Sequence, residues 1–372
     1  ASYINSVLRA ANLKTAVYTT AFYEIAGEQT PNHTHMTVTS QRSVQSFFAK
    51  AKRARVDYVV LEVTSHALEQ ARIAGVKVEV AVMTNLTQDH LDYHGTMERY
   101  AAAKSRLFTD YQAKHAVLNV DDQWFDFFMS KTMQPTITYG QRKDASMHLK
   151  TYSLTPTGST FKAQYKSHQL SMTTQLVGLF NIYNAMAAAS VGLALKLDSE
   201  QIKLGIASLA AVPGRMEQID EGQDFDVIVD FAYTPDALQN VLSTLQEVTK
   251  GKISIVFGAT GDRDATKRPA MGKVVGKLAD RIYLTDDETY TEDPVTIRDA
   301  VYVGIKQAKA QSKTQVIDDR LDAIKLAFKE AKKGDVVLLT GIGHENYRNM
   351  GGRKVEWDER HVARQHLKTL TK

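Results

Sequence analysis

The chain contains no cysteine among its 372 residues. Disulfide bonds and thiolate metal sites are therefore excluded, and we expect a reducing compartment, the cytoplasm. No apolar run approaches the roughly 18 residues that a membrane-spanning helix requires. The first residues, ASYINSVLRAANLK, have the pattern of an amphipathic helix without a signal-peptide cleavage site. We therefore expect no membrane partner.

The chain also has little excess charge. Its 46 basic and 42 acidic residues leave a net charge of +4. Nucleic-acid binding needs a clustered basic face, so we expect no nucleic-acid partner. Small anionic substrates remain compatible with this charge. We also expect a monomer.

Two glycine motifs that bind nucleotides are missing. No GxGxxG motif opens a helix, which argues against a dinucleotide-dependent dehydrogenase. No Gly-Lys pair is followed by Ser or Thr, because the three such pairs continue as GKI, GKV and GKL. A phosphate-binding loop of the Walker type is therefore absent from the printed residues.

The chain does contain strands that alternate with helices, the pattern of parallel α/β sheets. Apolar strands are predicted at 56–63 and 78–86, and helices at 96–108 and 181–197. Residues 145–175 alternate polar and apolar side chains, which indicates antiparallel strands.

A second strand–helix series begins near residue 224. Its predicted strands cover 224–232, 252–260, 281–287 and 334–343. The Pro-Gly pair of VPGRMEQI favours a hinge, so we predict one domain over 1–213 and a second over 214–372. The fold class is therefore α/β, with a central parallel-sheet domain and a C-terminal Rossmann-like domain.

Polar groups follow the first two apolar strands, which we expect to be neighbours. Glu62 ends one of them, Asp89 and His90 follow the next, and Lys104 lies on the helix beyond. Carboxylate oxygens and an imidazole suit Mg²⁺ or Mn²⁺. A lysine becomes a metal ligand only if a neutral amine reacts with CO₂ to give a carbamate. The alternative is that Lys104 is a surface helix residue and that the histidines are caps or core residues.

Eight segments occur in one order and together resemble the Mur ligases. They are LEVTSHALEQAR, TNLTQDHLDYHGTMERYAAAKSRLF, GLFNIYNAMAA, VPGRMEQI, VDFAYTPDAL, VFGATGDRDATKRPAMG, TEDP and GIGHENY. The resemblance covers residues 1 to about 366. It is strongest to the tripeptide synthetases of the family, which add the third residue of the peptidoglycan stem peptide.

The resemblance implies an ATP-dependent amide ligase. ATP phosphorylates a substrate carboxylate, and the amine of an amino acid attacks the acyl phosphate. Glu62 and His90 match the Mg²⁺ ligands of the family, and Lys104 matches its carbamylated lysine. Thr64, Gln70 and Arg72 match positions that hold the UDP-MurNAc-dipeptide, with Thr64 standing where serine is more usual.

The nucleotide contacts are implied in the same way. Asn184 matches an asparagine near the adenine, and Arg215 matches an arginine that reaches the phosphates. Asp230 and Tyr233 match the nucleotide-contacting segment, although Tyr233 replaces the usual histidine. Without the resemblance, Asn184 would be a helix-interior residue bonding its own backbone and Asp230 a strand-end cap.

The amino-acid site is implied for the C-terminal half. Arg263 matches a residue that grips the α-carboxylate, and Gly341 and Glu345 match residues at the far end of the side chain. Ile342 replaces the lysine usual between them.

The segment from Asp287 to Tyr290 sets the expected substrate. Family members that add diaminopimelate carry Asp-Asn-Pro-Arg here, and the arginine pairs with the distal carboxylate. This chain has Asp287, Glu288, Thr289 and Tyr290 instead. A lone ammonium would be satisfied by these acids, whereas a buried carboxylate would be unpaired. We therefore predict L-lysine, with L-ornithine next, unless Glu288 points to solvent.

The missing phosphate-binding loop is the main departure from the family. By resemblance the first helix follows that loop, so we expect the printed chain to begin just past it. We also expect it to lack a uridine-binding domain of roughly 100 residues. The printed residues should then not turn over ATP. Two alternatives remain, an inactive binding module of the same fold and a related ligase such as a folylpolyglutamate synthase or a lipid II-amidating enzyme.

Overall fold

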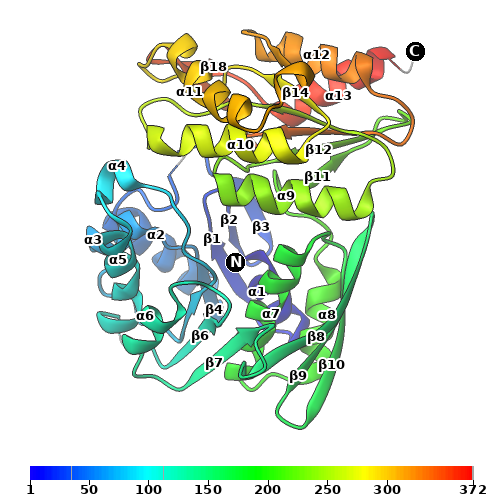
Figure 1. Ribbon diagram of the computed structural model, residues 1–372. Helices are drawn as coiled ribbons and strands as arrows, with labels where there is room; N and C mark the ends of the chain where they lie inside the picture. Colours follow the sequence, from blue (N-terminus) through cyan, green and yellow to red (C-terminus); the bar gives the residue numbers. More distant parts are fainter. Residues whose placement is uncertain (35, 112, 371–372) are drawn as a thin grey trace. The chain divides into compact units, whose positions relative to one another are not determined.

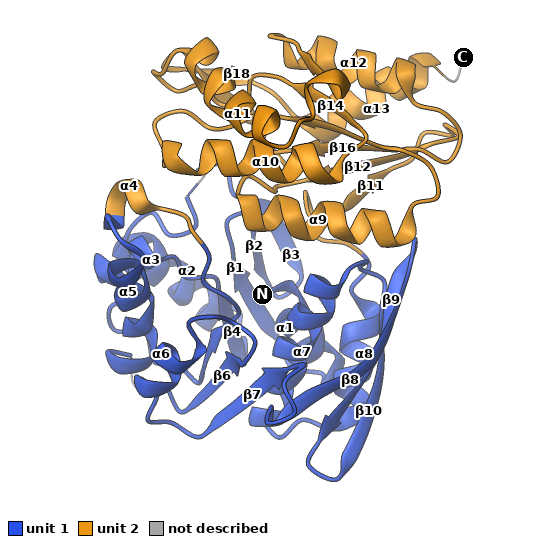
Figure 2. Cartoon of the chain, viewed as in Figure 1, with its two compact units in different colours: residues 1–87, 94–210 blue, residues 88–93, 211–372 orange. Residues whose placement is uncertain are grey.

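The computed structural model describes residues 1–34, 36–111 and 113–370, which form two compact units. The first unit comprises 1–87 and 94–210, and the second comprises 88–93 and 211–372 (Figure 2). Residues 88–93 were predicted to belong to the first domain, but they pack within the second unit.

Two sheets form the frame of the first unit. One has the order β3-β2-β1-β4, in which β1 pairs parallel with β4 and antiparallel with β2. The other has the order β10-β9-β8-β7-β6-β5, parallel from β5 to β8 and antiparallel from β8 to β10. The antiparallel strands predicted within 145–175 are therefore confirmed. The bounds are β1 Thr15–Tyr18, β2 Phe22–Ile25, β3 Glu28–Pro31, β4 Tyr58–Leu61, β5 Val80–Met83, β6 His115–Asn119, β7 Thr136–Gly140, β8 Met147–Thr155, β9 Gly158–Tyr165 and β10 His168–Thr174.

The helices of this unit begin at side-chain caps where the sequence supplies them. Ser40 makes a capping box at the start of α2, and Thr96 accepts the Arg99 backbone N–H at the start of α5. The helix α7 is mostly buried, in keeping with its run of alanines. The bounds are α1 Ser2–Ala10, α2 Gln41–Arg53, α3 Ser65–Glu69, α5 Met97–Thr109, α6 Phe125–Ser130, α7 Leu179–Ala194 and α8 Ser199–Ser208 (Figure 1). The short helix α4, Leu91–His94, belongs to the second unit except for its last residue.

One expectation about this unit was wrong. The strands β4 and β5 are not neighbours, because each is an outer strand of its own sheet and no ladder joins them in the described residues. An apolar run indicates that both faces of a strand are covered, and it carries no information about the strand that its backbone pairs with.

The second unit is a Rossmann-like α/β domain, as predicted. Its main sheet has the order β11-β12-β16-β13-β14-β15 and is parallel except for β11. A two-stranded hairpin, β17 and β18, follows β16. The strands are β11 Glu217–Ile219, β12 Asp226–Asp230, β13 Ile253–Phe257, β14 Arg281–Leu284, β15 Thr314–Val316, β16 Val336–Thr340, β17 Tyr347–Met350 and β18 Arg353–Glu356, and the helices are α9 Pro235–Val248, η1 Ala265–Lys267, α10 Arg268–Leu278, α11 Pro294–Gln307, η2 Gln311–Lys313, α12 Arg320–Glu330 and α13 Glu359–Leu370.

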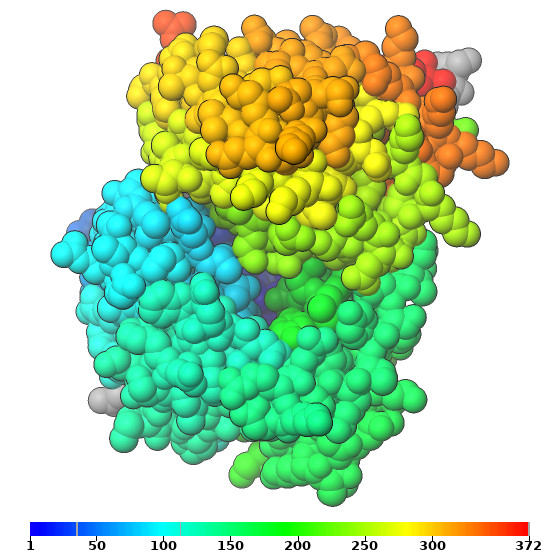
Figure 3. Space-filling view, viewed as in Figure 1, coloured from blue at the N-terminus to red at the C-terminus, as the bar shows by residue number. Residues whose placement is uncertain are grey.

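The core of this unit lies around β13 and β16, in which every residue is buried. Two glycines let α10 and α11 approach closely, since a Cβ on Gly272 would lie 2.0 Å from the Val301 carbonyl oxygen and one on Gly304 1.8 Å from that of Pro269. Residues of α10 and α11, in yellow-green to yellow-orange, lie on the face of the molecule drawn in the space-filling view (Figure 3). In neither unit do the described residues include a helix long and apolar enough to span a membrane.

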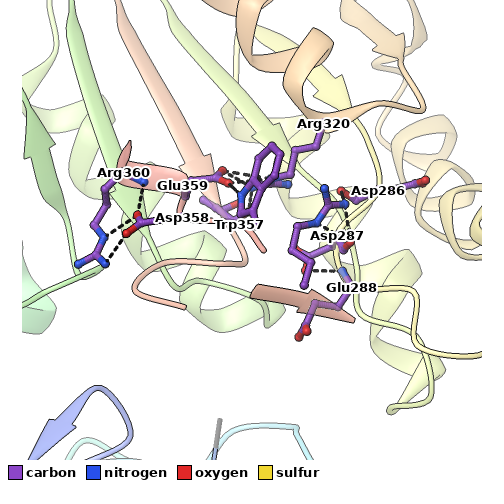
Figure 4. Close-up of polar contacts among 10 residues, drawn as sticks. Asp286, Asp287, Glu288, Arg320, Trp357, Asp358, Glu359 and Arg360 are labelled. Carbon is purple, nitrogen blue, oxygen red and sulfur yellow. Dashed lines mark hydrogen bonds and ion pairs between the residues drawn. The ribbon is translucent and has the colours of Figure 1, made fainter. Parts of the chain in front are cut away.

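A fully buried ion pair joins α12, α13 and the end of β16. The guanidinium of Arg320 donates to Glu359 at 2.6 Å and to the Thr340 carbonyl at 2.7 Å, and both charged side chains are 0% exposed. The Trp357 indole donates to the other Glu359 oxygen at 2.5 Å (Figure 4). Because both partners are inaccessible to water, each depends on the other for its charge.

Replacing Glu359 with glutamine should therefore destabilise the protein strongly. It leaves the Arg320 cation buried without an anion, which costs about 3–5 kcal/mol of the free energy of unfolding. Urea unfolding would measure the loss. The matched control is Asp358→Asn, which removes the neighbouring, partly exposed pair with Arg360 and should cost about 1 kcal/mol or less. Equal losses in the two variants would contradict this assignment.

Candidate active site

Three loops of the second unit meet at the carboxyl edge of its sheet. They follow β16, β13 and β14, which are neighbours in the sheet. In parallel sheets this edge is where ligands bind. The loops carry the residues predicted to bind an amino acid, which are Arg263, Asp287, Glu288, Tyr290, Gly341 and Glu345.

Glycines permit the loops to approach one another. A Cβ on Gly258 would lie 2.4 Å from the Thr285 carbonyl oxygen, and one on Gly261 would lie 2.0 Å from that of Thr289. Gly341 has φ +107°, and a Cβ there would lie 1.9 Å from an Asp287 carboxylate oxygen. Any larger residue at these positions would separate the loops.

Three carboxyl groups are buried where the loops meet. Asp287, Glu288 and Glu345 are 3%, 7% and 9% exposed. Glu288 accepts the backbone N–H of Asn349 at 3.0 Å and its side-chain amide at 2.7 Å, so Glu288 does not face solvent. Oδ1 of Asp287 accepts the Glu288 N–H at 2.7 Å, but Oδ2 has no hydrogen-bond partner among the described residues (Figure 4). A buried acceptor of this kind favours a ligand that donates.

Burial raises the pKa of each of these carboxyl groups. The pKa of Asp287 rises through desolvation, opposed by the charges of Arg320 and Arg348. The pKa of Glu288 rises through desolvation and through the charge of Asp287. Desolvation, followed by the charges of Glu288 and Asp287, raises the pKa of Glu345 to about 9. A ligand cation would relieve this repulsion.

Arg348 supports the acidic loop from its other side. It donates to the carbonyls of Asp286 and Asp287 at 2.8 and 2.7 Å, and its guanidinium lies 4.9 Å from the Trp357 ring centroid. The supporting residues Arg348, Arg320 and Glu359 were not predicted from the sequence. For Glu359 the sequence offered one signal, the run EWDER, in which four charged residues surround a tryptophan.

Arg263 and Tyr290, which were predicted to contact opposite ends of the amino acid, lie together. The Arg263 guanidinium is 5.2 Å from the Tyr290 ring centroid and 3.4 Å from its hydroxyl oxygen. Unlike the carboxyl groups, Arg263 is an exposed residue.

The structure also brings together Arg215 and Asp230, two of the residues predicted to contact the nucleotide. Asp230 accepts the Met216 N–H at 2.7 Å, and thus orders the turn that carries Arg215. Burial raises the pKa of Asp230, and the charge of Arg215 opposes this shift. Arg215 lies 4.8 Å from the ring centroid of Phe231, which also contacts Tyr233 with 5.1 Å between ring centroids.

The segment 88–93 packs against η1 of the same unit. Asp89 forms an ion pair at 3.2 Å with Lys267, whose side chain is only 3% exposed. The Gln88 amide donates to Asp264 and Thr266 at 3.2 and 2.9 Å. Lys267 also lies 4.7 Å from the Tyr233 ring centroid. This contact with Lys267 was not predicted.

Of the three residues predicted to bind the metal, Glu62 and Lys104 lie in the first unit. Glu62 accepts the Thr20 N–H at 2.9 Å, and the Lys104 amine on α5 lies 5.3 Å from the Tyr100 ring centroid. His90, in the second unit, has a left-handed backbone with φ +56°. The described residues contain no group of three or more His, Asp or Glu side chains arranged for a metal.

The remaining predicted residues make local contacts. Thr64 caps α3 by accepting the Ala67 N–H at 3.2 Å. Arg72 donates to the Gln70 side chain at 3.0 and 2.6 Å, so these two predicted residues are together. Asn184, on α7, donates to the Asn181 side chain at 3.5 Å.

Comparison with known proteins identifies the family of both domains. Residues 1–192 match the Mur ligase middle domain, and residues 214–343 match the domain described as Mur ligase, glutamate ligase domain. UDP-N-acetylmuramoyl-L-alanyl-D-glutamate–2,6-diaminopimelate ligase of Syntrophomonas wolfei is 38% identical over 99% of this chain and 76% of its own length. The Bacillus licheniformis ligase of the same name is 40% identical, over 99% of this chain and 75% of its own.

Solved structures of related ligases have the same fold. A 2,6-diaminopimelate ligase structure of that name superposes with a TM-score of 0.66 at 31% identity, covering 100% of this chain and 76% of the other. The folylpolyglutamate synthase of Mycobacterium tuberculosis, at 17% identity and a TM-score of 0.70, covers 99% of this chain and 87% of its own and shares the fold. With two family domains matched in order, and relatives of 38% and 40% identity over nearly its whole length, the chain belongs to the Mur ligase family.

Proposed function

We propose that the chain, within a protein that also supplies the phosphate-binding loop, acts as an ATP-dependent ligase that joins L-lysine to UDP-MurNAc-L-Ala-D-Glu through an acyl phosphate. L-Ornithine is the next candidate substrate. The observation that carries the proposal is the set of buried acids Asp287, Glu288 and Glu345 at the carboxyl edge of the second sheet. Cytoplasmic location and a monomeric state remain predictions from the sequence.

Each end of the amino acid has a proposed partner. The Arg263 guanidinium would bind the α-carboxylate in a bidentate manner, because its planar fork matches two carboxylate oxygens. The buried acids would receive the distal ammonium, and the free Oδ2 of Asp287 supplies an unused acceptor. This orientation leaves the α-amine to attack the carbonyl carbon of the acyl phosphate. The C–O bond to the phosphoryl group then breaks, so that inorganic phosphate leaves, and the amine loses a proton as the amide forms.

On the ATP side, Arg215, Asp230, Tyr233 and Asn184 are the proposed nucleotide contacts. Glu62, His90 and carbamylated Lys104 would hold Mg²⁺, which supplies charge neutralisation when an anionic phosphate approaches a carboxylate. The dipeptide substrate is assigned to Thr64, Gln70 and Arg72. The Arg72–Gln70 contact supports that assignment, since it holds a cation ready for an anionic group.

Diaminopimelate is the competing substrate, because both relatives named above are named for it. A distal carboxylate would enter a site that already holds three buried carboxyl groups, and its repulsion would be costly. An inactive binding module and a folylpolyglutamate-type ligase are the two competing functions. ATP-dependent amide formation with the UDP-MurNAc-dipeptide would exclude both.

The substrate preference should depend on the loop that follows β14. We expect wild-type protein to favour L-lysine over meso-diaminopimelate by at least about ten-fold, the effect of roughly 1.4 kcal/mol. Glu288→Asn combined with Tyr290→Arg should shift the ratio of the two dissociation constants towards diaminopimelate by a similar factor. Titration calorimetry would measure both constants. The exposed Glu356→Asn is the control, and an unchanged ratio in the double variant would show that this loop is not the selector.

Lysine binding should release a proton from Glu345. Its pKa of about 9 means that this group is mostly protonated at pH 7.5 when the site is empty. An incoming ammonium favours the ionised form, so the affinity for lysine should rise as the pH increases from 7 to 9. Calorimetry in buffers of different ionisation enthalpy would count the protons. Glu345→Gln should release about one proton fewer, and equal release would contradict the assignment.

The carbamate on Lys104 can be tested directly. Protein equilibrated with ¹³C-bicarbonate should show a carbamate resonance that Lys104→Arg lacks. In a protein that carries the phosphate-binding loop, Lys104→Ala should nearly abolish ligase activity. Lys114→Arg is the control, since that amine is exposed and paired with Glu79 at 2.9 Å. A Lys104→Ala enzyme with wild-type rate would refute the carbamate role.

A further inference from the structure

The loops that follow β13 and β14 are clamped together around Arg263. Asp262 accepts both the N–H and the hydroxyl of Thr291, at 2.9 and 2.8 Å, while its own N–H donates to Glu292 at 3.1 Å. Arg268, only 2% exposed, binds Glu292 through two hydrogen bonds of 2.6 Å. The flanks of Arg263 and Tyr290 are therefore fixed relative to each other before any ligand binds.

Tyr290 has a backbone conformation that is unusual for a bulky residue. Its φ is +49°, in the left-handed region. Hydrogen bonds hold the peptide on both sides, since its N–H donates to the Asn349 carbonyl at 2.9 Å and its carbonyl accepts from Gly352 at 2.7 Å. The strained backbone keeps the ring beside Arg263.

Arg263 itself has few other restraints. Within the described residues, its guanidinium makes one hydrogen bond, the 3.4 Å contact with the Tyr290 hydroxyl. The ring lies under the cation, with 5.2 Å between the guanidinium carbon and the ring centroid. A cation–π contact uses the face of the guanidinium and leaves N–H groups along its edge for a carboxylate.

We infer that Tyr290 is a positioning residue that orders Arg263 for the α-carboxylate and does not select the distal end of the amino acid. The inference rests on the proposed function, because it assumes an amino acid at Arg263. It revises the role predicted from the sequence, in which Tyr290 replaced an arginine that contacts the distal carboxylate. An α-carboxylate is common to every candidate substrate, so this role affects all of them equally.

The test is a double-mutant cycle on amino-acid binding. Tyr290→Leu removes the ring, and we expect about ten-fold weaker binding of L-lysine, L-ornithine and meso-diaminopimelate alike. Tyr290→Phe keeps the ring and should lose only about three-fold. In an Arg263→Gln background, Tyr290→Leu should change lysine binding less than about two-fold, because its target is gone. Calorimetry would give each constant, and thermal unfolding would confirm that each variant is folded.

Separate outcomes identify which idea is wrong. Additive losses in the cycle, or a lysine to diaminopimelate ratio that Tyr290→Leu alters more than about three-fold, would overturn the positioning role. Glu288→Gln tests the proposed function independently, since it should change that ratio. Lysine binding that is absent from the wild-type protein would overturn both.

Discussion

The buried pair between Arg320 and Glu359 is the interaction on which the acidic site depends. Arg320 binds the carbonyl of Thr340, the residue before Gly341, and its charge opposes the rise in the pKa of Asp287. Glu359 in turn accepts a hydrogen bond from the indole N–H of Trp357, and the Trp357 ring lies against Arg348. The pair thus fixes the loop after β16, and the charge of Arg320 has a larger effect on the pKa of Asp287 than the opposing charge of Glu359.

The same network explains why three acids can share one buried place. Gly341 admits the Asp287 carboxylate, Asn349 binds Glu288, and Arg348 binds the carbonyls of the acidic loop. Arg320 and Arg348 therefore supply positive charge to Asp287, while its Oδ2 has no hydrogen-bond partner among the described residues. A buried acceptor of this kind favours a ligand that donates a hydrogen bond.

Most of the helices and strands could be predicted from the sequence, but the pairing of the strands could not. The strands of the second series, the antiparallel strands β8 to β10 and the helices α1, α5 and α7 were predicted because period and caps are local properties. The separation of β4 from β5 was not predicted, because strand pairing is a property of the whole fold. The candidate site residues were predicted from the resemblance to the family. The resemblance indicates which residues contact the ligands, but it does not indicate which residues hold them in place. Arg348 and Lys267 are supporting residues, and only the folded chain shows what they contact.

The second unit is discontinuous in sequence, because residues 88–93 pack within it while the residues on either side belong to the first unit. Asp89 supplies the carboxylate for Lys267, an amine that is almost completely inaccessible to water. A polypeptide that began at residue 211 would therefore lack the carboxylate that pairs with Lys267. A division of the chain at the Pro-Gly turn suggests a C-terminal domain that is complete in itself. The ion pair of Lys267 shows that residues 211–372 alone do not contain all of its partners. The six residues from the other half complete it.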